Sequence, residues 1–479
     1  MSGTAQLPDG GIYIDDRDEA SLVVSGRTGG WDIIHDKQTR EWIRNGGTGP
    51  LSHDQADRLH ARGLLTRSGA TRGTSATVSL GDRILAPRHQ MRRYPVLCVF
   101  HVHNWCNLSC TYCYTMADKV TRNRLGADLM IKAVDELVSG DLPTTCLEFH
   151  GGEPTMALHD IRRVVLHAED VYRKAGKNVS FSIQTNGYRL SDECCSFLAE
   201  HDFSVRVSLD GDRATHNSAR LNHAGRGSYD GVVAGITKLR SFGIVPHAVA
   251  VLHRANRDKI TQMYDAMVDL GVASVRFLPV FKGGEMKDDS LWLNGREYFE
   301  AKWDLIEHIL DRAARGLPTP ILPNLVSGEL GALTSFLRRY MCLRQPCGAG
   351  SNMVCIDDNG DLYPCEEMAG ISEFRIGNLN HDTILDAFAT PIVQHLRGRI
   401  TAAIDGCRDC PWRQFCAGGC SHKSHTEFGD LRHGSEHCAY YQQIFRALLW
   451  LEHDRPGSWQ VLGAQPGDLY ASQEARQWH

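Results

Sequence analysis

Three cysteines, Cys106, Cys110 and Cys113, stand at C-x-x-x-C-x-x-C spacing in the stretch HNWCNLSCTYCYT, residues 103–115, and no fourth cysteine follows to complete a tetrahedral site. Three thiolates on a short loop can bind three irons of a cubane 4Fe-4S cluster and leave the fourth iron open to a small molecule. The spacing alone also allows a zinc site completed by His101 or His103. The surrounding sequence has to distinguish the two metals.

Strand-like runs position this loop. Six short apolar runs alternate with helical patterns between residues 95 and 280: PVLCVFHVH, TCLEFHG, VSFSIQT, VRVSLDG, PHAVAVLH and SVRFLPV. This alternation predicts an α/β fold with a parallel sheet, a partial (β/α)6 TIM-type barrel. The cysteine triplet follows the first run, GGEP the second, QTNG the third and SLDG the fourth. Because such barrels gather their chemistry at the carboxyl ends of the strands, all four motifs are expected at one mouth.

A second group of cysteines lies toward the C-terminus, where residues 342–438 hold nine of the sixteen. In a reducing compartment, clustered thiols are more often metal ligands than disulfides. A zinc ribbon is the alternative for the stretch CRDCPWRQFC, residues 407–416. Five cysteines fit no ligand pattern and are expected to be small core residues: Cys98, Cys146, Cys194, Cys195 and Cys355.

Composition limits the function classes. The 479 residues carry a net charge of -5 at a pI near 6.5, which does not indicate nucleic acid or an anionic membrane as a partner. Apolar runs are far shorter than a membrane span, and the N-terminus lacks the pattern of a secretory leader. The sequence therefore predicts a cytoplasmic protein of several domains with no membrane partner.

Residues 1–94 have a pattern of their own. The pattern predicts a strand at 21–26, helices at 35–46 and 51–65, and a hairpin at 74–85, with Ser52 capping the second helix. This order resembles that of a winged helix. The region holds 13 Lys and Arg against 11 Asp and Glu, too even a balance for a DNA-binding footprint. A DNA-binding winged helix and a purely structural cap remain alternatives. The predicted domains are 1–94, a barrel at 95–330, a cysteine-rich domain at 331–440, and a helix and tail at 441–479.

Taken together, CNLSCTYCY, GGEP, QTNG and SLDG resemble the motifs of the radical S-adenosylmethionine enzymes. The resemblance implies that S-adenosylmethionine chelates the open iron and that one electron cleaves it to methionine and a 5'-deoxyadenosyl radical. It also implies ten cofactor-binding residues: Tyr112, Gly151, Gly152, Glu153, Gln184, Thr185, Asn186, Ser208, Asp210 and Arg220. Among these, Glu153 would meet the cofactor's ammonium group, and Arg220 its carboxylate.

The C-terminal cysteines resemble a SPASM domain, which implies two auxiliary 4Fe-4S clusters and three clusters in all. The family pattern assigns an inner set, Cys342, Cys347, Cys365 and Cys420, and an outer set, Cys407, Cys410, Cys416 and Cys438. An electron donor such as flavodoxin or ferredoxin is implied as a partner.

SPASM enzymes mostly modify peptides, and the N-terminal order is similar to the peptide-recognition winged helix of ribosomal-peptide (RiPP) maturases. The resemblance implies a precursor peptide whose leader binds this domain as an added strand and whose side chains are oxidised, most simply by cross-linking. Glu366, next to Cys365, stands where sulfatase maturases carry an aspartate that acts as the catalytic base. Glu366 is therefore predicted to be the base of this enzyme. The alternative is that Glu366 is a solvated residue of a turn. The competing functions are formylglycine formation by a sulfatase maturase and an iron-sulfur sensor that binds DNA.

Overall fold

The computed structural model of the chain describes residues 5–7, 11–67, 93–113, 122–280, 289–319, 326–334 and 341–464. The chain forms two compact units. The first contains Met1–Gln90, Val326–Cys347 and Gly398–His479, and the second contains Met91–Leu325 and Gly348–Arg397. The predicted N-terminal domain thus shares a unit with two parts of the cysteine-rich region.

The second unit is built on six parallel strands in sequential order, which confirms the predicted partial (β/α)6 barrel. They are β6 (Leu97–His101), β7 (Thr144–His150), β8 (Asn178–Thr185), β9 (Ser204–Ser208), β10 (His247–Leu252) and β11 (Val275–Pro279). Buried and partly exposed residues alternate along β7, β9 and β10, as expected of strands with one face on a core.

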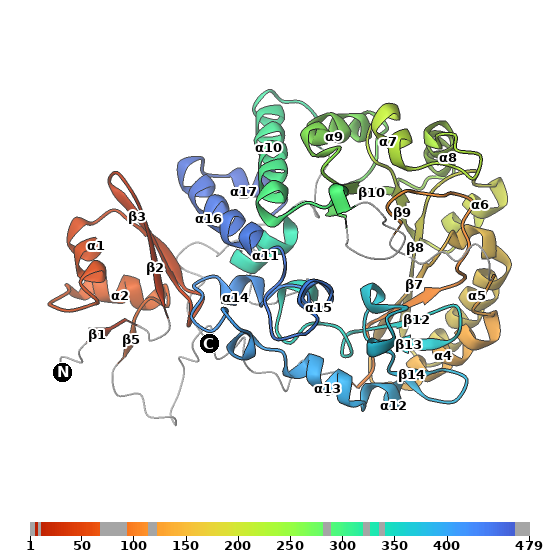
Figure 1. Cartoon of the computed structure of the whole chain (residues 1–479), viewed down its shortest axis with the longest axis horizontal. Coiled ribbons are helices and arrows are strands. Elements are labelled where there is room, and N and C mark those ends of the chain that lie inside the picture. Colours follow the sequence, from red (N-terminus) through yellow and green to blue (C-terminus); the bar gives the residue numbers. More distant parts are fainter. Residues whose placement is uncertain are drawn as a thin grey trace. The chain divides into compact units, whose positions relative to one another are not determined.

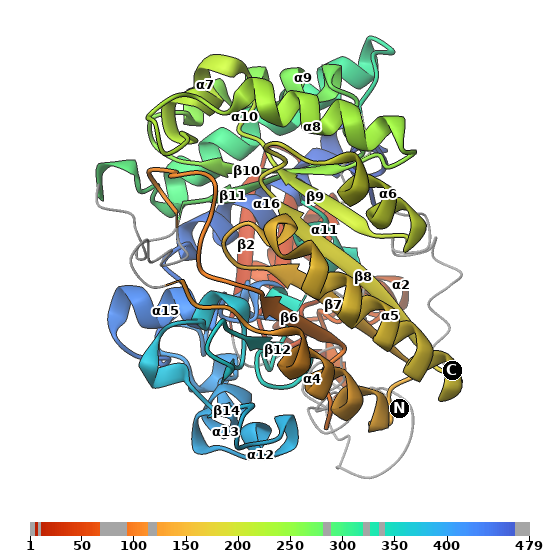
Figure 2. The same ribbon diagram turned by 90° about the vertical axis from the view of Figure 1, so that its right-hand side faces the viewer.

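Helices connect the strands and cover the outer face of the sheet (Figures 1 and 2). They are α4 (Ala127–Ser139), α5 (Leu158–Lys174), α6 (Asp192–Glu200), α7 (Arg213–Ala219), α8 (Tyr229–Ser241), α9 (Ile260–Asp269) and α10 (Gly295–Ala314). Each crossover returns the chain to the same edge, so the motifs after β6, β7, β8 and β9 all fall at the carboxyl ends of neighbouring strands.

Three strands from the cysteine-rich region extend this sheet. β12 (Met353–Ile356) pairs with β6 in parallel, and β13 (Asp361–Tyr363) and β14 (Gly377–Asn378) follow antiparallel. These strands were not predicted, because runs of two to four residues are too short to show a periodic pattern. Glu366 follows β13 directly, on a short 3-10 turn, Glu366–Met368, in the same unit as the barrel strands.

The N-terminal part of the first unit has a three-stranded antiparallel sheet, β2 (Ile12–Arg17), β3 (Ala20–Ser25) and β4 (Trp31–Ile34), followed by α1 (Lys37–Arg44) and α2 (His53–Ala61). The predicted strand and both helices are confirmed, and Ser52 forms a capping box with Gln55. Strands β2 and β4 were missed. The predicted hairpin at 74–85 lies outside the described residues. A short pair, β1 (Ala5–Gln6) and β5 (Thr66–Arg67), completes this part.

The rest of the first unit is helical: α11 (Ser327–Thr334), α14 (Arg413–Cys416), α15 (Ser421–Phe428), α16 (Cys438–Asp454) and α17 (Ser458–Val461). Two further helices, α12 (Ile384–Phe388) and α13 (Pro391–Gly398), precede its last segment. Helix α16 confirms the predicted C-terminal helix. Among the described helices, none is both long and apolar enough to span a bilayer.

Strand β2 packs on α16 within the first unit. Asp15 accepts hydrogen bonds from Arg446 and from the Trp450 indole, both at 2.6 Å, and the Tyr13 ring lies 5.2 Å from that of Trp412. Because an arginine and two large aromatic side chains join the two parts, the N-terminal sheet is an integral element of this unit.

Candidate functional site at the mouth of the barrel

The loop after β6 brings the three predicted cluster cysteines together. Burial raises the pKa of Cys106 to about 12, with contributions from the charges of Cys110 and Cys113, and burial raises the pKa of Cys110 to about 11. A metal cation bound among these thiols would favour their thiolate forms by offsetting burial and the repulsion between the charges. The loop therefore fits a metal or cluster site, and the assignment of the three cysteines as ligands stays a prediction.

Gly151 and Gly152 run alongside this loop, which explains why both are glycines. A Cβ on Gly151, whose φ is +112°, would lie 2.7 Å from the carbonyl oxygen of His103, and one on Gly152 would lie 1.8 Å from that of Trp105. Their backbone follows the loop closely, with the Gly152 N–H donating to His103 at 2.9 Å. Any larger residue would separate the end of β7 from the cysteine loop.

Glu153 lies fully buried at the end of β7, among neutral donors. Its Oε1 accepts from the backbone N–H and hydroxyl of Thr155 and from the Thr185 hydroxyl, at 3.1, 2.6 and 2.7 Å, and its Oε2 accepts from the Asn186 N–H at 2.7 Å. Burial nevertheless raises the pKa of Glu153, because these hydrogen bonds lower it less than desolvation raises it. Only Oε2, with its single donor, keeps room for another strong partner.

The polar residues at the end of β8, Gln184, Thr185 and Asn186, connect the cysteine loop with the ends of β7 and β9. The Asn186 amide donates to the Asn107 side chain at 2.7 Å and to the Cys106 sulfur at 3.4 Å, so it reaches the cysteine loop. Gln184 donates to the Ser208 hydroxyl at 3.0 Å. Thr185 and Asn186 thus contact Glu153, and Gln184 contacts Ser208 on the neighbouring strand.

Asp210, at the end of β9, is held by other residues of the chain. It pairs with Arg220, whose Nε lies 2.9 Å from its Oδ2, and it also accepts from the Tyr112 hydroxyl and from the Val251 N–H at 2.9 Å. Burial raises the pKa of Asp210, but the charge and hydrogen bonds of Arg220 outweigh burial and hold it below its ordinary value. The carboxylate that Arg220 contacts here is therefore Asp210, and contacts of Tyr112, Asp210 and Arg220 with a cofactor stay predictions.

Glu366 contacts a histidine that was not selected from the sequence. Its Oε1 lies 3.1 Å from Nε2 of His150, the residue before Gly151. The Gly151 N–H donates to Nδ1 of the same ring at 2.8 Å, so Nδ1 must be the acceptor nitrogen and Nε2 carries the hydrogen. His150 is thereby fixed as a donor to the Glu366 carboxylate.

His101 completes a group whose ligand atoms lie within 4.8 Å of those of His150 and Glu366, a spacing that a metal ion could use. Burial lowers the pKa of His101 to about 4, so its ring is neutral. A metal at Nε2 of His150 would require the hydrogen on Nδ1, where the Gly151 N–H already points. The geometry therefore favours a hydrogen-bonded carboxylate over a metal site at these three residues.

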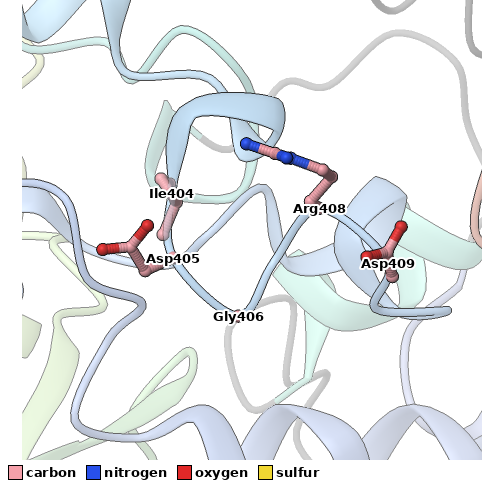
Figure 3. Close-up of a pocket in the computed structure, with 5 residues that line it drawn as sticks. All are labelled: Ile404, Asp405, Gly406, Arg408 and Asp409. Carbon is pink, nitrogen blue, oxygen red and sulfur yellow. The ribbon is translucent and has the colours of Figure 1, made fainter.

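In the first unit, the outer set of cysteines is gathered around α14. Burial raises the pKa of Cys416, and the charges of Cys410, Cys407 and Cys438 add to it. A pocket lies beside Cys407, lined by Ile404, Asp405, Gly406, Arg408 and Asp409 (Figure 3). The four thiols fit a four-ligand site, and the choice between a cluster and zinc rests on the domain type.

The inner set is divided between the units. Cys342, Cys347 and Cys420 belong to the first unit and Cys365 belongs to the second, so the set stays a prediction. Four of the five cysteines expected in the core have buried side chains, namely Cys98, Cys194, Cys195 and Cys355, and Cys146 is partly buried.

Sequence reasoning missed Asn107 and His150, and it considered His101 only as a possible zinc ligand. Asn107 lies inside the cysteine motif and could have been weighed as a loop-shaping residue. The two histidines end β6 and β7, a position where a polar residue in an apolar run is itself a signal. Their partner Glu366 could not be assigned to them because β12 and β13 were not foreseen.

Comparisons with known proteins match two regions of the chain. Residues 100–267 match the Radical SAM superfamily, and residues 347–411 match SPASM, described as an iron-sulfur cluster-binding domain. A serine-type anaerobic sulfatase-maturating enzyme of Bacteroides thetaiotaomicron is 24% identical over 71% of this chain and 86% of its own length. A cysteine-type anaerobic sulfatase-maturating enzyme of Clostridium novyi is 23% identical over 71% of this chain and 91% of its own.

Solved structures share the fold. Native anSMEcpe with bound AdoMet aligns with a TM-score of 0.66 at 20% identity, covering 75% of this chain and 98% of that one. SuiB of Streptococcus suis, bound to the precursor peptide SuiA, aligns with a TM-score of 0.57 at 15% identity, covering 91% of this chain and 99% of that one.

Proposed function

We propose that this chain, a radical S-adenosylmethionine enzyme with a SPASM domain, binds the leader of a ribosomally made precursor peptide and oxidises the peptide's side chains, most simply by cross-linking them. S-adenosylmethionine, the 4Fe-4S cluster and the auxiliary iron-sulfur clusters of the SPASM domain are the cofactors of its two matched domains. The observation that carries the proposal is the N-terminal sheet with its two helices, built into the unit that holds the outer cysteines.

Relatives support a peptide substrate. One anSMEcpe structure holds a peptide, Cp18Cys, and the SuiB structure holds its precursor peptide. The SuiB likeness extends over 91% of this chain and the anSMEcpe likeness over 75%. The wider coverage by SuiB, which is bound to a precursor peptide, supports the proposal of a precursor-peptide substrate.

The N-terminal sheet has two edges where a leader strand could add. On β2, the hydrogen bond from the Gly26 N–H to Gly11 and the register with β3 show that the backbone N–H and carbonyl of Ile14 point away from the sheet. On β4, the hydrogen bond from the Ser25 N–H to Gly30 and the register with β3 show the same for Ile33. At Ile33 both groups are already engaged, because the N–H donates to Asp32 and the carbonyl accepts from Arg58, each at 3.0 Å. A peptide on β4 would have to displace these side chains.

The chemistry divides between cofactor and chain. When bound, S-adenosylmethionine and its cluster supply a 5'-deoxyadenosyl radical that removes a hydrogen atom from the peptide. Closing a cross-link then requires the loss of one further electron and one proton, so the peptide loses two hydrogen atoms in all. We assign the proton to Glu366, held by His150, and an auxiliary cluster, when bound, would be the electron acceptor.

The experiment uses the reconstituted full chain with S-adenosylmethionine, a reductant and the short peptide encoded beside its gene. We expect a product lacking two hydrogen atoms per modified site, with 5'-deoxyadenosine formed in equal amount. Reconstitution should give about twelve irons per chain, and the Cys106, Cys110 and Cys113→Ala variant should lose about four of them and all 5'-deoxyadenosine. Zinc in the wild-type protein would contradict the proposal.

The leader site is tested best by single substitutions, since deleting residues 1–94 would also uncover α16. Ile14→Pro and Ile33→Pro each remove one outward N–H without removing a ladder hydrogen bond. Leader binding to the full chain, followed by fluorescence anisotropy, should be lost in only one of them, with melting temperatures as the control for folding. Undiminished binding in both would remove the sheet edge from the proposal.

Formylglycine formation is the second candidate, supported by the sulfatase-maturating relatives. A peptide carrying a sulfatase serine or cysteine motif, offered in place of the precursor, separates the two. Conversion of that peptide without any leader would favour the sulfatase maturase. Salt-sensitive binding of duplex DNA by the full chain would instead favour a sensor.

A further inference from the structure

A buried arginine, Arg399, lies between α13 and the turn Thr401–Ala403 in the first unit, with 5% of its surface exposed. Its guanidinium faces five acceptors at 2.8–3.1 Å: one is bonded by Nε, one by Nη1, and three share the two hydrogens of Nη2. The acceptors are the carbonyls of Gly418, Gly419, Leu431 and His433 and the hydroxyl of Ser424. All five acceptors are neutral.

Among the described residues, no carboxylate pairs with Arg399, although a buried cation normally requires an anion. Burial lowers the pKa of Arg399, and the groups whose charge raises it are four cysteines: Cys347, Cys420, Cys407 and Cys416. Two of these belong to the predicted inner set and two to the predicted outer set. Once these cysteines ligate a cluster, their thiolates would supply the negative charge that balances this arginine.

The hydrogen bonds connect the segments that carry these cysteines. Gly418 and Gly419, at φ +80° and +71°, turn their carbonyls toward Arg399 in the four-residue step from Cys416 to Cys420. Leu431 and His433 lie in the loop that precedes Cys438. The Arg399 side chain thus holds the backbone between Cys416 and Cys420 and the backbone of the loop before Cys438.

We propose that Arg399 is a shared positioning residue and counter-charge for the two auxiliary clusters, and that its charge raises the reduction potentials of both. The inference rests on the cluster assignment of the proposed function. Reduction adds one negative charge to a cluster, and a fixed cation nearby in a low-dielectric interior stabilises that reduced state. With Arg399 in place, each auxiliary cluster accepts an electron from an oxidised peptide more readily.

The test measures potentials and not only activity. In the full chain carrying Cys106, Cys110 and Cys113→Ala, only auxiliary clusters remain, and their potentials are titrated by electron paramagnetic resonance. Arg399→Gln should lower both, by about tenfold in the redox equilibrium, which is about 59 mV for one electron. Arg399→Lys, which keeps the charge, should lower them less.

Thr401→Val is the matched control. Thr401 lies two residues away, and its hydroxyl donates to Gln345 at 3.0 Å in the same buried segment, so this variant loses a neutral hydrogen bond and no charge. Its potentials should equal those of the parent. Unchanged potentials in Arg399→Gln with full iron content would overturn the proposal, as would an equal shift in Thr401→Val.

If Arg399→Gln loses its auxiliary iron, Arg399→Lys decides the question. Retained clusters in the lysine variant would support the role of Arg399 as a counter-charge. Equal loss of iron in both variants would show that Arg399 only holds the backbone through hydrogen bonds, and would overturn the proposal. A parent protein with zinc, or without auxiliary iron, would contradict the proposed function itself, so the two failures are distinguishable.

Discussion

The ends of β7 and β9 each carry one buried carboxylate, and the two groups have opposite electrostatics. Glu153, after β7, is 0% exposed and accepts only from neutral hydroxyl and backbone donors, so burial raises its pKa. Asp210, after β9, is 1% exposed and has the Arg220 guanidinium against it, so its pKa is held low despite burial. Asp210 is thus already paired with a cation, whereas Glu153 would be stabilised by binding one.

This difference assigns the two strand ends different tasks. The Asp210–Arg220 pair stabilises the mouth of the barrel in the free protein, because its charges are mutually neutralised. Glu153 is the group that gains from a positively charged ligand, since an ammonium beside Oε2 would offset its desolvation. The predicted ammonium contact of S-adenosylmethionine therefore suits the end of β7 better than the end of β9.

Replacing Asp210 with asparagine should have the largest effect on stability. Asp210→Asn leaves the buried Arg220 without its anion, a loss of about 3–5 kcal/mol in the free energy of unfolding. Chemical denaturation of the full chain measures it. Asp230→Asn, which breaks the exposed pair of Asp230 with Arg213, is the matched control and should leave stability unchanged. Equal stability of Asp210→Asn and wild type would show that the pair is not a structural ion pair.

The corresponding change on β7 should act on binding and not on folding. Glu153→Gln removes a buried charge that destabilises the free protein but also gives up one acceptor, so stability should stay within about 1 kcal/mol of wild type. Affinity for S-adenosylmethionine should fall about ten- to a hundredfold, because the carboxylate that would meet the ammonium is lost. Chemical denaturation measures the stability, and isothermal titration of the reconstituted protein with S-adenosylmethionine measures the affinity. Unchanged affinity would restrict Glu153 to shaping the turn.

The pH dependence of unfolding should separate the two carboxylates by sign. Asp210 has a folded pKa below its ordinary value of 3.8, so its contribution is present above that pH and is lost as pH falls through the folded pKa. Glu153 has a folded pKa above 4.5, so it costs stability as pH rises from 4.5 through the folded pKa. Subtracting each variant's curve from the wild-type curve should give slopes of opposite sign.

The sequence could place both carboxylates but could not tell them apart. GGEP and SLDG follow β7 and β9 as the strand pattern predicted, and both were assigned to the cofactor. What separates them is Arg220, ten residues after Asp210, whose side chain turns back to Asp210 at the end of α7. A turn of this kind depends on tertiary packing, which has no periodic signature in the chain.

The same limit explains the partner of Glu366. The sequence marked Glu366 by its neighbour Cys365 and marked the end of β7 by GGEP, but nothing related the two stretches until β12 paired with β6. Strands of two to four residues carry too few alternating positions to be predicted. Long β/α repeats and helix caps such as Ser52 were predictable because their signals are local.

A change at His150, which links the end of β7 to Glu366, should affect the oxidation of the peptide and not the cleavage of the cofactor. His150→Ala removes the donor that holds the carboxylate, a hydrogen bond to a charged group worth about 1.5–3 kcal/mol, so the rate of peptide oxidation should fall about tenfold or more. His150→Gln can still donate through its amide and should recover part of the rate, whereas iron content and 5'-deoxyadenosine formation should remain at wild-type levels in both. His167→Ala is the control, because His167 on α5 contacts Asp135 at 2.6 Å in a histidine–carboxylate pair on the outer helices. Two results would contradict this role of His150: His150→Gln as slow as His150→Ala, or a loss of 5'-deoxyadenosine in proportion to product in both variants. Either result would show that His150 acts through Gly151 on the predicted cofactor site and not on Glu366.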